Sequence, residues 1–181
     1  MVKPVFRRYL KLLLVVAVIL LADQLTKRWV VSEIGLGETR IPIPFLSPLF
    51  QLTRSHNTGA AFGFLPQAGD IFRVISTIVV FILLYFYPRI PDEQRLSRVA
   101  TALIISGALG NVIDRLTYGY VIDFIHYQIP GVISNVSNLA DHAIVLGVIC
   151  FFIASWREER KAKMSAGANA SLPSDSTSGS A

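Results

Sequence analysis

The sequence predicts an all-α polytopic membrane protein with four transmembrane helices. Only 16% of its 181 residues are charged and the mean hydropathy is +0.53, whereas an average soluble domain has roughly 25% charged residues. This composition excludes an intrinsically disordered chain, which needs low hydrophobicity and high charge. Four apolar segments also come close to the roughly 20 residues that a helix needs to cross a bilayer.

The predicted spans are residues 9–31, 71–87, 99–113 and 139–156. Lys11 lies near one end of the first span, where its side chain can reach the headgroups. A cleaved signal peptide is the alternative for this segment, because a basic start precedes an apolar stretch. We favour a retained span, since Leu20-Leu21-Ala22 is a poor cleavage site and apolar residues resume at Trp29.

Basic residues near the span ends predict the orientation. Eleven of the 17 lysines and arginines lie in the N-terminus, in the 88–98 connection or after Trp156. Both termini are therefore expected in the cytoplasm, and segments 32–70 and 114–138 are expected outside. The net charge of +5 follows from this topology and does not indicate nucleic-acid binding.

The outer segments and the C-terminus differ in composition. Segment 32–70 contains prolines that keep residues 41–44 extended, a possible strand at residues 50–53 and a turn signal at Asn57-Thr58-Gly59. Residues 164–181 are mostly Ser, Ala and Gly and are expected to be disordered. We predict a membrane domain of residues 1–163 and a tail of residues 164–181. The single Cys150 excludes an internal disulfide.

Four aspartates lie in or beside the spans, namely Asp23, Asp114, Asp123 and Asp141. An ionisable group inside a bilayer costs at least about 2.5–3.5 kcal/mol, so each is a functional candidate. The orientation was derived from basic residues alone, yet it places all four acids at the outer membrane surface. Lys27 follows Asp23 by four residues, the spacing of a helical ion pair.

Two of these acids have an amide three residues before them, which places amide and acid about 60° apart on a helix face. These pairs are Asn111 with Asp114 and Asn138 with Asp141. Two carboxylates that lie close together hold one proton between them. The ionised member can deprotonate water, and the protonated member can polarise a carbonyl, as in aspartic proteases. The spacing leaves open which two acids are paired.

Five motifs occur in order along the chain: Asp23-Gln24-Leu25-Thr26-Lys27, Asn57-Thr58-Gly59-Ala60-Ala61-Phe62, Gly110-Asn111-Val112-Ile113-Asp114-Arg115, Val121-Ile122-Asp123-Phe124-Ile125 and Asn138-Leu139-Ala140-Asp141. Each is weak alone. Together they resemble the bacterial lipoprotein signal peptidases, also called signal peptidase II, and the resemblance covers roughly residues 10–156.

The resemblance implies an intramembrane aspartyl endopeptidase that cleaves a prolipoprotein just before its diacylglyceryl-modified cysteine. It implies the dyad Asp123 and Asp141. The supporting polar residues that it implies are Asp23, Asn57, Asn111, Asp114, Arg115 and Asn138. It also implies a small extracytoplasmic β-rich cradle at residues 40–66 and a flap-like outer loop after Arg115.

The remaining expectations concern partners and location. We expect the lipid-modified prolipoprotein and membrane lipid as partners, no nucleic acid, no cofactor, no metal and a monomer. The predicted location is the bacterial cytoplasmic (inner) membrane, with the site at the outer leaflet. The chain departs from the family pattern at Ser137, where an aromatic residue is usual, and at His142, where a small residue is common. His142 is expected to perturb the titration of Asp141.

Other functions remain as alternatives. Three histidines (His56, His126 and His142) lie in the outer half, but without metal-ligand spacing and without an HExxH motif. A small transporter would use Asp23 and Asp114 as a proton relay, although the cytoplasmic halves of the third and fourth spans carry no acid. A non-catalytic assembly factor would not need the dyad.

Single residues also have structural alternatives. The dyad aspartates would form an ion pair or a helix cap, and Asp114 with Arg115 would be an interfacial charge cluster. Asn57 would serve only the turn.

Overall fold

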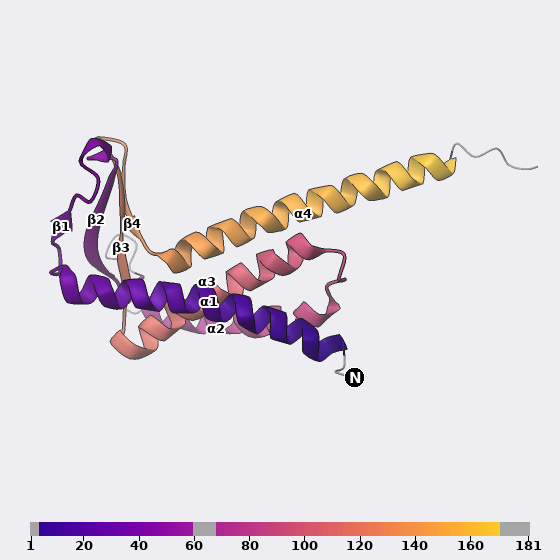
Figure 1. Cartoon of the computed structure of the whole chain (residues 1–181), viewed down its shortest axis with the longest axis horizontal. Coiled ribbons are helices and arrows are strands. Elements are labelled where there is room, and N and C mark those ends of the chain that lie inside the picture. The colour runs from indigo at the N-terminus through magenta and orange to yellow at the C-terminus, as the bar shows by residue number, and fades with distance from the viewer. Residues whose placement is uncertain (1–3, 60–67, 171–181) are drawn as a thin grey trace, which may run out of the picture.

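The computed structural model describes residues 4–59 and 68–170, in which four long helices carry a small antiparallel sheet at one end (Figure 1). The helices are α1 (Pro4–Glu33), α2 (Ala68–Phe86), α3 (Arg95–Tyr118) and α4 (Leu139–Ala170). The strands are β1 (Thr39–Arg40), β2 (Phe50–Asn57), β3 (Val121–Ile129) and β4 (Ile133–Ser137). Two short 3-10 turns, η1 (Pro44–Leu46) and η3 (Tyr87–Arg89), complete the described part.

Three segments of the described chain are long and apolar enough to cross a membrane: Asp70–Arg89, Arg95–Tyr118 and Leu139–Met164. They contain the predicted spans 71–87, 99–113 and 139–156. Helix α1 covers the other predicted span, 9–31, as one continuous helix of 30 residues. It is not among these three segments, and its role as a fourth span stays a prediction.

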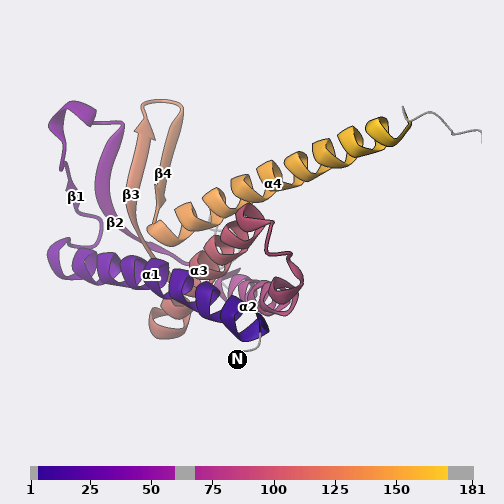
Figure 2. The same cartoon turned by 45° about the vertical axis from the view of Figure 1, so that its right-hand side comes forward.

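Helix α3 packs against α1, α2 and α4 (Figure 2). Small residues allow this close approach, as they do in membrane helix bundles. A Cβ added to Gly107 would collide with the backbone carbonyl of Ala140 on α4, and one added to Gly110 would lie 2.6 Å from Asp23 Oδ2 on α1. Both glycines are thus packing positions beside the start of α4.

The sheet has the strand order β1-β2-β3-β4, and every neighbouring pair is antiparallel. Strand β2 begins at Phe50, as predicted, and extends to Asn57. The β2–β3 register places Asn57 opposite Val121 and Ser55 opposite Asp123. Residues 121–125 of β3 are buried, so the middle of the sheet continues the core formed by the helices.

Two expectations from the sequence are wrong. The stretch after Arg115 forms the last three residues of α3 and then strands β3 and β4, because its β-branched and aromatic residues pair in the sheet. It is therefore no separate flap. Residues 164–170 were expected to be disordered but belong to α4, which continues to Ala170; alanine and methionine favour helix there. Residues 60–66 of the expected cradle and residues 171–181 of the tail lie outside the described residues.

Candidate active site

Asp123 lies in the central strand β3 and is 2% exposed. Its two carboxylate oxygens accept hydrogen bonds from two amides. Asn57 Nδ2 donates to Oδ2 at 2.9 Å and Asn138 Nδ2 donates to Oδ1 at 2.6 Å. The first contact follows from strand register, because diagonal neighbours on one face of an antiparallel pair are within side-chain reach. Asn57 also accepts the Gly59 N–H at 2.8 Å, so it serves both the turn and the carboxylate.

Burial raises the pKa of Asp123 to about 6. The negative charge of Asp141 acts in the same direction, whereas the amide hydrogen bonds from Asn57 and Asn138 oppose the rise because they stabilise the ionised form. Asp123 therefore exchanges its proton near neutral pH, where an acid–base group is most effective.

Asp141 lies in the first turn of α4 and is half-buried. Its Oδ1 accepts a hydrogen bond from Asn111 Nδ2 at 2.7 Å, and its backbone N–H donates to Asn138 Oδ1 at 2.9 Å. The second contact is an N-cap, in which a side-chain oxygen binds an unpaired N–H at the helix start. Asn138 therefore caps α4 and, through its other amide atom, holds Asp123. One residue links the two aspartates.

A buried cluster of three charges supports these amides from α1 and α3. Lys27 Nζ lies 2.9 Å from Asp23 Oδ2 and 2.8 Å from Asp114 Oδ2, and all three side chains are at most 1% exposed. Lys27 also donates to Asn111 Oδ1 at 3.3 Å. Asn111 thus accepts from Lys27 through its oxygen while its nitrogen holds Asp141, which fixes the amide orientation.

Each of the two acids in this cluster accepts a backbone N–H from the residue that precedes one of the proposed dyad aspartates. Asp23 Oδ1 accepts the N–H of Ala140 at 3.0 Å, next to Asp141. Asp114 Oδ2 accepts the N–H of Ile122 at 3.1 Å, next to Asp123. The cluster therefore ties the starts of α4 and β3 to the helix bundle. Asp114 is fully buried, so the interfacial charge cluster considered from the sequence is wrong for this residue.

Arg115 also lies beside the aspartates, within electrostatic range of Asp123 and Asp141. Its Nη1 donates to the Asn111 carbonyl oxygen at 3.4 Å. Its Nε is buried without a hydrogen-bond partner in the described part of the chain. Arg115 thus retains donor capacity that its neighbours do not use.

A cavity of about 420 Å³ opens beside Asp141 and Asn57. Polar residues line its end near the aspartates, and Val145 and Leu146 of α4 line its apolar side. Both apolar side chains are more than half exposed. The cavity therefore runs from Asp141 onto exposed apolar side chains of α4, one of the helices apolar enough to span a membrane.

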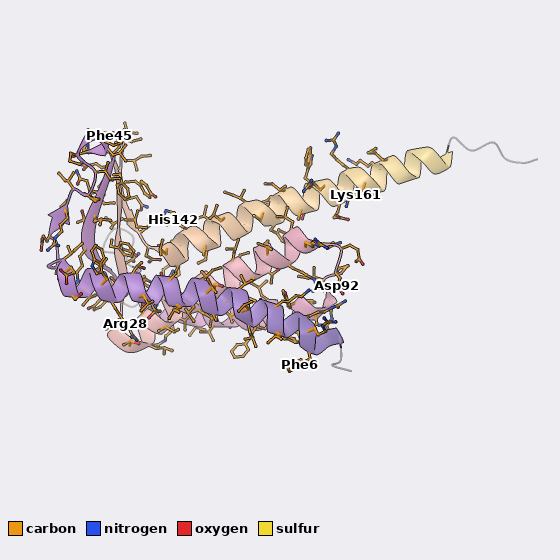
Figure 3. All side chains as sticks on the ribbon, in the orientation of Figure 1. Phe6, Arg28, Phe45, Asp92, His142 and Lys161 are labelled. Carbon is orange, nitrogen blue, oxygen red and sulfur yellow. The ribbon has the colours of Figure 1, made fainter. Side chains whose placement is uncertain are left out.

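His142 stands at the edge of this cavity, at the start of α4 (Figure 3). Its Nδ1 lies 2.6 Å from the Asn138 carbonyl oxygen and its Nε2 lies 3.1 Å from the Tyr127 hydroxyl. Because the carbonyl can only accept, Nδ1 carries a proton. Ser137, the other departure from the family pattern, is buried and donates to the Ile125 carbonyl oxygen at 3.4 Å. The influence of His142 on the titration of Asp141 stays a prediction.

The structure brings all eight candidates from the sequence to one end of the bundle. Two further residues take part that the sequence did not identify as site residues. Lys27 was expected only as an ion-pair partner of Asp23, and Gln24 donates to Asp114 Oδ1 at 2.9 Å. Both belong to the first motif of the chain, and this position in a motif is the sequence feature that could have identified them as site residues.

The family model described as signal peptidase (SPase) II matches residues 15–157. Among curated relatives, the lipoprotein signal peptidase of Halothermothrix orenii is 37% identical over 148 residues, covering 81% of this chain and 96% of its own. That of Streptococcus pyogenes serotype M1 is 41% identical over 151 residues, covering 82% and 96%. That of Halalkalibacterium halodurans is 40% identical over 150 residues, covering 83% and 94%.

Two solved structures, each described as a bacterial membrane enzyme, share the fold. One superposes with a TM-score of 0.73 at 32% identity, covering 82% of this chain and 89% of its own. The other gives 0.72 at 33% identity, covering 80% and 91%. With the family model matching most of the described helices and sheet, this chain belongs to the signal peptidase II family.

Proposed function

We propose that Asp123 and Asp141 together hydrolyse the signal peptide of a diacylglyceryl-modified prolipoprotein, just before its lipidated cysteine. Membership of the family makes the chain a lipoprotein-processing protease of the membrane. The aspartyl mechanism rests on one observation, namely that Asn138 binds the side chain of Asp123 and the backbone of Asp141 at once. This amide holds the carboxyl group of Asp123 beside the backbone of Asp141, and a proton-sharing pair requires two acids that lie close together.

The roles of the two acids follow from their surroundings. Burial and the charge of Asp141 raise the pKa of Asp123 to about 6, so we assign the shared proton to Asp123. Asp141 Oδ1 is held by Asn111, and no hydrogen bond engages Oδ2 within residues 4–59 and 68–170. This oxygen is available to take a proton from the attacking water, while Asp123 polarises the scissile carbonyl and then protonates the leaving amine.

Substrate enters sideways from the bilayer along α4. The cavity beside Asp141 continues onto Val145 and Leu146, an apolar surface that suits a signal helix or a diacylglyceryl chain already in the membrane. Arg115 Nε is buried and has no partner among the described residues. We expect it to donate a hydrogen bond to a backbone carbonyl of the substrate. All of these groups come from one chain, and the machinery lies within residues 1–163, the proposed peptidase domain.

We further propose that α1 is a fourth span, that both termini are cytoplasmic and that the site faces the outer leaflet of the inner membrane. An ion pair of 2.8 Å between Arg8 and Asp92 joins the start of α1 to the α2–α3 connection. In Figure 3, Phe6 and Asp92 lie towards one end of the molecule, whereas Arg28, Phe45 and His142 lie towards the other. The basic segments at the starts of α1 and α3 thus share one end, and the sheet occupies the opposite one.

A cleavage assay tests the mechanism. Purified protein in lipid bicelles is given a diacylglyceryl-modified precursor, and the wild type is compared with Asp123→Asn and Asp141→Asn. Each change removes a proton-transfer group, so we expect a loss of about 10²–10⁴-fold in kcat. Asp70→Asn is the matched control, because Asp70 is an exposed acid whose one ion pair among the described residues is with Arg73, and it should retain full activity.

Three other outcomes would contradict the proposal. Near-normal cleavage by either asparagine variant would remove that aspartate from the chemistry. Loss of activity with a chelator and its return with zinc would indicate a metalloprotease. Proton flux through liposomes without cleavage would indicate a transporter, although Asp23 and Asp114 are both paired with Lys27.

A further inference from the structure

We propose that this protein binds an anionic phospholipid in a groove between α1 and α3, at the end of the bundle opposite the sheet. The groove has a volume of about 560 Å³. Leu12 and Ala102 form an apolar floor and Val15 and Val99 form its sides. These residues belong to helices that pack against each other, so the groove runs along the bundle and can hold part of an acyl chain.

The rim of the groove is strongly basic. A second hollow of about 160 Å³ adjoins it and shares Lys11, Asp92 and Arg98 with it. The two hollows together are lined by five cations and one carboxylate: Arg7, Arg8, Lys11, Arg95, Arg98 and Asp92. The site therefore carries a large positive excess where an apolar groove meets the end of the spans, which is where lipid headgroups lie.

The single carboxylate of this rim is already neutralised. Asp92 Oδ2 pairs with Arg8 at 2.8 Å and Asp92 Oδ1 pairs with Arg98 at 2.7 Å. The hydrogen bond from Arg8 accordingly lowers the pKa of Asp92. Lys11 and Arg95 have no ion pair in the part of the chain that the structure describes.

Arg8 supplies an independent sign of a missing partner. Its Nη1 donates to the Pro88 carbonyl oxygen at the rim of the bundle, but its Nε is buried and unpartnered among the described residues. A buried donor without a partner costs free energy, and native structures rarely leave one. An anionic oxygen next to Arg8 would satisfy it.

These features together select the ligand class. Basic pockets between membrane helices bind anionic lipid headgroups, since apolar contact and charge attraction then act on one molecule. A free phosphate would use the rim but leave the apolar floor empty. A zwitterionic lipid would fill the floor but leave the positive excess unbalanced. We therefore assign the groove to a phospholipid with a net negative charge, such as phosphatidylglycerol.

Lipid binding to the full-length protein tests this assignment. Detergent-solubilised protein is titrated with phosphatidylglycerol or phosphatidylcholine, and bound lipid is counted by native mass spectrometry. The variant Lys11→Gln with Arg95→Gln removes two exposed cations. Each basic residue near an anionic headgroup contributes roughly a fivefold factor, so we expect the double variant to bind phosphatidylglycerol about 30-fold more weakly.

The control removes the same charge elsewhere. Arg160→Gln with Lys163→Gln changes two exposed cations on α4 and should leave phosphatidylglycerol binding unchanged. Phosphatidylcholine should bind weakly to all three proteins. Equal binding of the two lipids, or equal losses in both double variants, would overturn the proposal. Displacement of the bound lipid by millimolar inorganic phosphate would also overturn it, since the site would then be one for phosphate alone.

Discussion

Lys27 is the residue whose removal tests the structural argument most sharply. It is 1% exposed and forms ion pairs with two carboxylates, Asp23 at 2.9 Å and Asp114 at 2.8 Å. The substitution Lys27→Met keeps the apolar stem and removes the charge. Two buried carboxylates are then left without a cation, and breaking one buried ion pair by removing a single partner costs about 3–5 kcal/mol. We therefore expect at least that loss in the free energy of unfolding, a large part of the roughly 5–15 kcal/mol of a typical protein.

The measurement is equilibrium unfolding in bicelles, with Lys161→Met as the matched control. Lys161 pairs with Glu158 at 3.1 Å, but the two side chains are 73% and 42% exposed, and such surface pairs contribute about 1 kcal/mol or less. Adding Asp23→Asn and Asp114→Asn to Lys27→Met should restore much of the stability, because asparagine can still accept the N–H groups of Ala140 and Ile122 without a charge. Equal losses for Lys27→Met and Lys161→Met would refute the reasoning.

Three further predictions follow from other contacts. Asn138→Ala removes the amide that joins the two aspartates and should lower kcat by about 10–100-fold with little change in KM, because hydrogen bonds to charged groups contribute about 1.5–3 kcal/mol; a change in KM alone in steady-state kinetics would contradict this. The protonated form of Asp123 is lost as pH rises through its pKa of about 6, so kcat/KM should fall there. Asn57→Ala removes a hydrogen bond that stabilises the carboxylate, so the pH at which kcat/KM falls should rise by about one unit. A downward shift of this pH would contradict the assignment. Gly107→Ala places a Cβ against a backbone carbonyl that cannot give way and should lower stability by about 1–3 kcal/mol in thermal unfolding; the control Gly35→Ala meets only a flexible glutamate side chain and should change little.

Local sequence patterns predicted most of the helices and part of the sheet. Apolar runs predicted α2, α3 and α4, since about 20 apolar residues are the length that a helix needs to cross a bilayer. β-branched and aromatic residues predicted the start of β2 at Phe50. Val121-Ile122-Asp123-Phe124-Ile125 has the same β-branched and aromatic composition, but the resemblance implied a flap-like loop for this stretch and no strand was predicted there. Helix α4 ran past residue 164 because Ser and Ala content does not by itself end a helix.

The sequence by itself predicted eight site residues and indicated the family, because five short motifs in order carry that information. Only the tertiary structure shows which contacts each of the four acids makes. Asp23 and Asp114 meet Lys27 in a buried ion cluster, whereas Asp123 and Asp141 meet through Asn138. Helical spacing predicts neighbours three or four residues apart, but the bonds that make this division join α1 to α3 and the sheet to α4. These contacts join residues far apart in the sequence, so local spacing does not predict them.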